Sequence, residues 1–88
     1  MGDVEEAIRR IVRRCEDEAR TVYELVVSSG FDPGDWIDRE EIYRALENMV
    51  ASGEISRWDA MQLMRVRGIE YVVGREVREL SRGRRLAV

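Results

Sequence analysis

The sequence contains no histidine and no lysine, and Cys15 is its single cysteine. Histidine is the side chain whose unperturbed pKa lies nearest neutrality, and it is the most frequent general base and a common zinc ligand. Its absence removes the usual base of serine and cysteine triads. One thiol alone excludes an internal disulfide and any CxxC metal or redox site. We therefore predict that the chain is not an enzyme, has no catalytic residues or metal ligands, and needs no cofactor.

Long apolar runs are also missing. No stretch of about 18 residues is apolar throughout, which is roughly the length that a membrane-spanning helix needs. The first residues, Met1 to Glu6, lack the basic and then apolar order of a signal peptide. We therefore expect no contact with a membrane and a cytoplasmic location.

What is present describes one folded domain. The chain has 88 residues, of which 44% are hydrophobic and 38% charged, and this length allows a single modest core. Asn48 and Gln62 are the only amide side chains. Few amides together with dense Arg and Glu resemble the composition of thermophile proteins, so we expect a thermophilic source.

Apolar residues recur at helical spacing along most of the chain. The longest stripe runs from Val4 to Val26 and predicts one helix over residues 3–28, opened by an acidic capping pair, Asp3 and Glu6. Further helices are predicted over residues 38–52, 56–67 and 69–80. The fold class is therefore all-α, a single-domain bundle of about four helices led by a long N-terminal helix. Residues 1–80 would form the domain, and residues 81–88 a basic C-terminal tail.

Residues 69–80 also allow a second interpretation. Gly74 and Arg75 suit the turn of a β-hairpin, with arms on either side. Residues 38–88 would then resemble a winged helix in the order of their elements, an α+β fold with a C-terminal hairpin. That resemblance implies a nucleic-acid-binding protein of the winged-helix or helix-turn-helix type.

The segment from Gly30 to Asp35 holds the only proline and two glycines, so it predicts a turn. The acidic residues that follow resemble the calcium loop of an EF-hand, but the pattern fails. In the best register only Asp32 and Glu41 would coordinate, which are too few oxygens for tight binding. We expect Asp35 and Asp38 to cap the next helix instead.

Charge is divided unevenly along the chain. Residues 1–64 hold eight arginines and fifteen acidic residues, net −7, whereas residues 65–88 hold seven arginines and three acidic residues, net +4. A compact basic end suits phosphates or an acidic protein surface. The candidate contacts are Arg75, Arg78, Arg82, Arg84 and Arg85.

These patterns favour a non-enzymatic helical interaction module that acts through protein–protein association. The apolar stripe of the first helix is some six turns long, so we expect self-association as a homodimer or another homo-oligomer. Cys15 lies on this stripe and is predicted to be buried and unreactive. Aromatic residues are enriched at interface hot spots, and the expected anchor residues are Tyr23, Leu25, Trp36 and Tyr43. The alternative is nucleic-acid binding through the arginine-rich C-terminal segment.

Overall fold

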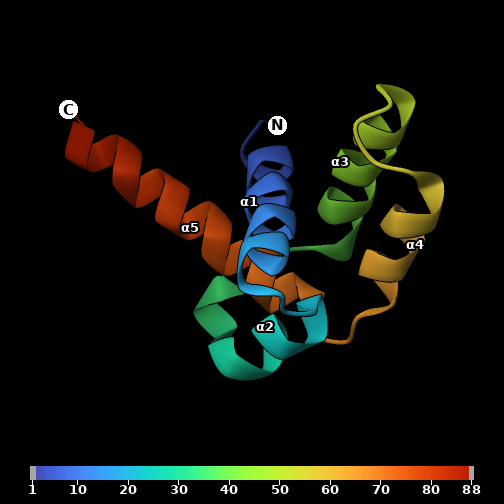
Figure 1. The fold of residues 1–88 in the computed structure, drawn as a ribbon. Helices are drawn as coiled ribbons and strands as arrows, with labels where there is room; N and C mark the ends of the chain where they lie inside the picture. The colour runs from blue at the N-terminus through green and yellow to red at the C-terminus, as the bar shows by residue number, and fades with distance from the viewer. Residues whose placement is uncertain (1, 88) are drawn as a thin grey trace.

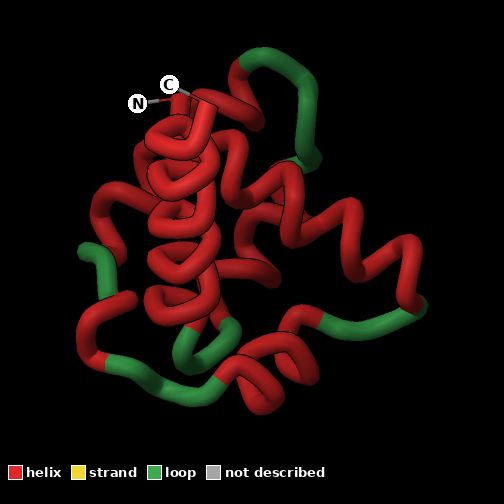
Figure 2. The backbone as a smooth tube through the Cα atoms, turned by 90° about the vertical axis from the view of Figure 1, so that its left-hand side faces the viewer, coloured by secondary structure: helices red, strands yellow, loops and turns green. Residues whose placement is uncertain are grey.

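The computed structural model describes residues 2–87, with the side chains of residues 2–83. The fold is all-α, as predicted, and residues 2–87 contain no strand. It has five α-helices where about four were expected, and a short 3-10 helix (Figures 1 and 2). In chain order these are α1 (Gly2–Glu18), α2 (Val22–Ser29), η1 (Pro33–Asp35), α3 (Arg39–Ala51), α4 (Arg57–Arg65) and α5 (Ile69–Ala87).

One apolar core joins all five helices. In Figure 1, α1 stands between α5 on one side and α3 on the other, while α2 crosses below them and α4 lies outside α3. The buried stripe of α1 is therefore covered within the chain itself. The largest of the fully buried side chains are Ile11, Val26, Ile42, Leu46, Ile69 and Val73.

The single helix predicted over residues 3–28 is wrong, because the chain breaks into α1 and α2. Ala19 takes a left-handed conformation with φ of 53°. Thr21 then starts α2 with a complete capping box: its hydroxyl accepts from the backbone N–H of Glu24, and the Glu24 carboxylate accepts from the backbone N–H of Thr21. Both exchanges satisfy amides that a helix start leaves free, which stabilises a new helix at this point.

The next two helices form as predicted. The Asp38 side chain accepts from the backbone N–H of Glu40 and starts α3, and Ser56 accepts from the N–H of Asp59 and starts α4. Gly68 lies beyond the end of α4, in the turn before α5, with φ of +89°.

Residues 69–80 belong to α5, so the helix predicted here is confirmed and the alternative hairpin is wrong. Gly74 is buried inside that helix, where a side chain would meet the backbone carbonyl oxygen of Asp35. The glycine therefore allows the η1 segment to approach α5 closely, and it does not form a turn. Without the hairpin, the winged-helix arrangement is absent. The helix also continues past Leu80, where the predicted helix ended, to Ala87.

The turn predicted around Pro33 is present as η1, but Asp35 does not cap α3. Its buried side chain pairs with Arg78 of α5, with Arg78 Nη1 2.6 Å from Asp35 Oδ1. Asp32 supplies the cap of η1 by accepting from the backbone N–H of Gly34. This ion pair fixes the η1 segment on the middle of α5.

Among the helices of residues 2–87, none is both long and apolar enough to cross a membrane.

Candidate functional site

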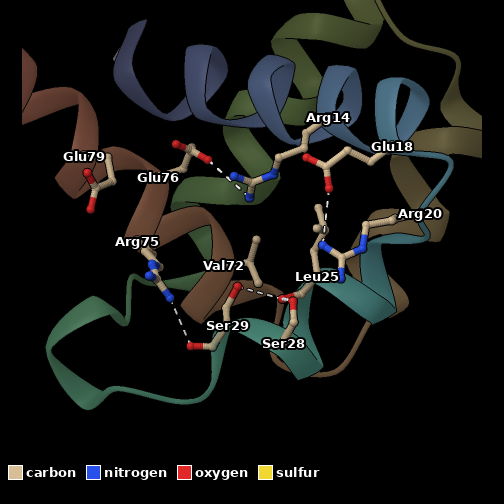
Figure 3. A pocket seen from close by; sticks show the side chains of 10 residues that line it. All are labelled: Arg14, Glu18, Arg20, Leu25, Ser28, Ser29, Val72, Arg75, Glu76 and Glu79. Atoms are coloured by element: carbon tan, nitrogen blue, oxygen red, sulfur yellow. Dashed lines mark hydrogen bonds and ion pairs between the residues drawn. The ribbon is translucent and has the colours of Figure 1, made fainter.

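A polar cleft of about 570 Å³ lies between the C-terminal part of α1, α2 and α5 (Figure 3). Its walls carry three arginines and three glutamates above an apolar floor of Leu25 and Val72. Sites for small molecules are usually lined mainly by apolar side chains with a few placed polar groups. This cleft is instead lined mainly by charged and polar side chains.

The charges of the cleft already have partners within the chain. Arg14 pairs with Glu76 at 3.6 Å, which bridges α1 and α5, and Arg20 pairs with Glu18 at 3.3 Å. Arg75 donates to the Ser29 carbonyl oxygen at 3.1 Å (Figure 3). These contacts tie three elements together.

The hydroxyl groups of the cleft offer no activated nucleophile. Both Ser28 and Ser29 donate to the carbonyl oxygen of Leu25, at 3.2 and 2.7 Å. A serine nucleophile needs a base within hydrogen-bond reach, and neither hydroxyl has one here. Among the residues described, no group of three or more His, Cys, Asp or Glu side chains is placed to hold a metal ion.

A second hollow has the composition of a binding surface. It is a groove of about 360 Å³ between α3 and α4, with an apolar floor and charged ends. We call it the α3–α4 groove. Its lining residues are Tyr43, Leu46, Glu47, Arg57, Ala60, Met61, Met64 and Arg65.

Exposed apolar side chains surround this groove. Trp58 is 68% exposed and is the most exposed large apolar residue described, while Met61 is 53% and Tyr43 50% exposed. Trp58, Met61 and Arg65 follow at i, i+3 and i+7, so they share one face of α4. Aromatic, methionine and arginine side chains are those enriched at protein interfaces.

The two walls of the groove differ in charge. On α3, Glu40 and Glu47 flank Tyr43 at i−3 and i+4 and therefore share its face. On α4, the charged residues that line the groove are Arg57 and Arg65. Glu47 and Arg57 pair across the groove at 3.5 Å. Of the charged residues that line the groove, the one on α3 is acidic and the two on α4 are basic, with apolar side chains between them.

A hydrogen bond at one end of α3 holds the two walls in place. Arg39, the first residue of α3, donates to the carbonyl oxygen of Met64 near the end of α4, and its guanidinium also pairs with Glu70 of α5 at 3.3 Å. The geometry of the groove therefore depends on three helices.

The predicted anchor residues do not form one patch. Tyr43 lines the α3–α4 groove, whereas Tyr23 on α2 and Trp36 after η1 are exposed elsewhere. Leu25 is buried in the core, 2% exposed, and so is not available to a partner.

Three of the five arginines predicted to contact phosphates or an acidic partner already bind groups of their own chain. Arg75 binds the Ser29 carbonyl oxygen, Arg78 binds Asp35, and Arg82 lies 3.8 Å from Glu79. The side chains of Arg84 and Arg85 lie outside the described residues.

Cys15 was predicted to be buried, and it is partly buried and packs against the core. Burial raises the pKa of its thiol, with Arg14 acting in the opposite direction. A raised pKa keeps the thiol protonated near neutrality and lowers its reactivity.

No protein-family model matches the chain, and no curated protein or solved structure matches it.

Sequence reasoning did not single out Trp58 and Met61 of the third predicted helix as exposed residues, and Met64 beside them is partly buried against the core. One signal was present. Trp58, Met61, Leu63 and Met64 point in directions that span more than half of the helix circumference. A helix of nine residues at the edge of a small core buries one stripe, so some of these side chains had to be exposed.

Proposed function

We propose that this protein is a non-enzymatic helical interaction module that associates with a second copy of itself through the α3–α4 groove. The observation that carries the proposal is the exposed apolar surface of Tyr43, Trp58 and Met61 around this groove. Contiguous apolar surface rimmed by polar residues is typical of protein–protein contacts.

The distribution of charge favours a second copy as the occupant. In a two-fold dimer the same patch contacts itself, so every group on one wall meets the other wall of the partner. A two-fold axis that places α3 of one copy against α4 of the other brings Glu40 and Glu47 toward Arg57 and Arg65. Opposite charges then face each other around an apolar centre, as complementary interfaces require.

Trp58 supplies the anchor in this arrangement. It stands beside the groove on α4 and is not among the residues that line it. Under the two-fold axis, the indole of each copy enters the partner's groove between Tyr43 and Met61. Anchors of this type in interface centres carry most of the binding energy.

The stripe of α1 no longer supports self-association, because α3 and α5 cover it within the chain. The prediction of self-association therefore stands on different residues from those that first suggested it.

Sedimentation velocity over a micromolar concentration series tests the proposal. The wild-type protein is expected to shift from monomer to dimer as concentration rises. Met61→Glu places a charge in the apolar centre, opposite the acidic wall of the partner, and is expected to remain monomeric. The matched control is Val27→Glu on α2, since Val27 is 57% and Met61 53% exposed. A wild-type protein that stays monomeric, or equal loss of dimer in both variants, contradicts the proposal.

A further inference from the structure

The polar cleft between α1, α2 and α5 contains a hydrogen-bond donor that the fold leaves unused (Figure 3). Arg14 lines this cleft, and its Nε atom is buried without a hydrogen-bond partner among residues 2–83. Buried polar groups in proteins are nearly always hydrogen-bonded, because an unsatisfied group loses its contacts with water and gains nothing in return. The Nε–H group of Arg14 therefore favours an acceptor that a ligand supplies.

Arg14 faces a carboxylate whose hydrogen-bonding capacity is also incompletely used. Its Nη2 atom lies 3.6 Å from Glu76 Oε1, and the Glu76 side chain is only 13% exposed. This separation is that of an ion pair and is longer than a hydrogen bond of roughly 2.7–3.2 Å. A carboxylate accepts at both of its oxygens. Glu76 can therefore accept from a further donor inside the cleft.

Arg75 brings another cation to the same cleft from α5. Its Nη1 atom donates to the carbonyl oxygen of Ser29 at 3.1 Å, which is a neutral acceptor. A guanidinium has five N–H donors and pairs most strongly with anionic acceptors. Arg75 can therefore bind an anionic group while it keeps its contact with α2.

The charge of the cleft does not favour a ligand of one sign, because three arginines and three glutamates line it. A simple anion bound to Arg14 would also approach Glu76, and a simple cation bound to Glu76 would also approach Arg14. A ligand with one group of each sign avoids both repulsions. Because the two side chains are only 3.6 Å apart, the opposite charges of that ligand should also be neighbours, as they are in an α-amino acid.

We propose that this cleft binds a free α-amino acid with an uncharged polar side chain. The carboxylate of the ligand accepts from Arg14 and Arg75, and its ammonium group donates to Glu76. The rest of the wall includes Arg20 and Glu18, which hydrogen-bond to each other at 3.3 Å, and two serines. A polar side chain without charge can contact these groups and leave their ion pair intact.

The size and place of the cleft are consistent with this ligand. Its volume of about 570 Å³ falls within the range of roughly 300–1,000 Å³ that is usual for ligand pockets. It shares no lining residue with the α3–α4 groove. Binding of the amino acid is therefore expected whether or not the chain associates with a second copy.

The probe is L-glutamine, titrated into the full chain at low salt and followed by isothermal titration calorimetry. We expect saturable binding at millimolar concentrations. Glutaramate lacks the ammonium group of glutamine, and 4-aminobutanamide lacks its carboxylate. Each is expected to bind at least about tenfold more weakly, because hydrogen bonds to a charged group contribute roughly that factor. The same loss is expected for 4-aminobutyrate, whose two charges lie at opposite ends of its chain.

Glu76→Gln tests the site with a readout that a purely structural effect would not give. It removes the contact with the ammonium group and also the repulsion of an anion. The variant should therefore bind L-glutamine at least about tenfold more weakly but glutaramate more tightly than wild type does. Arg75→Gln should weaken the binding of both ligands.

The matched control is Glu70→Gln. Glu70 also lies on α5, is 16% exposed and pairs with an arginine of another helix, Arg39, at 3.3 Å, but it does not line the cleft. Its replacement is expected to leave the affinity for L-glutamine unchanged. Thermal melting shows whether each variant is folded.

Three results overturn the proposal. The first is the absence of saturable L-glutamine binding to wild type. The second is binding of glutaramate, 4-aminobutanamide or 4-aminobutyrate as tight as that of L-glutamine. The third is a loss of L-glutamine binding in Glu70→Gln as large as in Glu76→Gln, which would assign the effect to structure.

Discussion

Replacing Gly74 with alanine tests how closely the η1 segment packs against α5. A Cβ at this position would overlap the backbone carbonyl oxygen of Asp35 and lie 3.0 Å from Ile37 Cγ2. Backbone cannot rotate away as a flexible side chain does, so η1 must move off the helix. That movement also pulls Asp35 away from Arg78, whose guanidinium lies 2.6 Å from its carboxylate.

The expected cost follows from two opposing effects. Alanine in an open helical position is more stable than glycine by about 1 kcal/mol. Overpacking in a close-packed site costs about 1–3 kcal/mol, and a clash with backbone lies at the upper end or beyond. We therefore expect a net destabilisation of at least about 2 kcal/mol. In a domain of this size that lowers the melting temperature by roughly 8–16 °C.

Gly83 provides the control within the same helix. It also lies in α5, and a Cβ there meets no atom within 4 Å. Gly83→Ala gains the same helix propensity without the clash, so it is expected to raise stability by up to about 1 kcal/mol. Urea unfolding followed by circular dichroism compares the two variants with wild type. A Gly74→Ala protein as stable as Gly83→Ala refutes the close approach of η1 to α5.

Three further outcomes are expected. Thr21→Ala removes the capping box of α2 and is expected to lower the free energy of unfolding by about 1 kcal/mol; unchanged urea unfolding contradicts a separate α2. The hydrogen bonds from Arg9 lower the pKa of Glu54, and those from Thr21 lower the pKa of Glu24. The folded state therefore binds fewer protons than the unfolded state, and stability falls as pH drops below the ordinary carboxyl value of 4.5. Melting curves of Glu54→Gln should show a smaller decrease over that range. Cys15 in the native protein is expected to react with a thiol reagent more slowly than in urea, and equal rates would place it in solvent.

The parts of the fold that follow from local patterns could be predicted. Asp38 and Ser56 are capping residues in front of amphipathic runs, and both start helices where they were expected to. Their side chains bond amides only two or three residues away, so the signal lies within a short window of sequence.

The parts that depend on contacts between distant residues could not be predicted. Gly74 favours a turn when read locally, but its neighbour in space is Asp35, on a segment about forty residues earlier in the chain. The helical spacing of apolar residues continues across Ala19, so it predicts one helix over residues 3–28. Thr21 and Glu24 nevertheless have the spacing of a capping box, which marks the start of a second helix.

The candidate surfaces also depend on contacts between distant residues. Aromatic content indicated a protein interface, but the sequence does not reveal which rings share a surface. Tertiary packing buries Leu25 and assigns Tyr43 and Trp36 to separate surfaces. Trp58 is a candidate interface residue because α4 lies at the edge of the molecule, packed on α3 (Figure 1).

The central claim is that two copies meet through their α3–α4 grooves, and an isotope-filtered NOE measurement tests it most directly. A sample is mixed from copies with ¹³C-labelled methionine methyl groups and unlabelled copies, at a concentration where the dimer is populated. The account predicts intermolecular NOEs between the Trp58 indole of one copy and the methyl groups of Met61 and Met64 of the other. Intermolecular NOEs that involve only other parts of the molecule, or none at all, would contradict it.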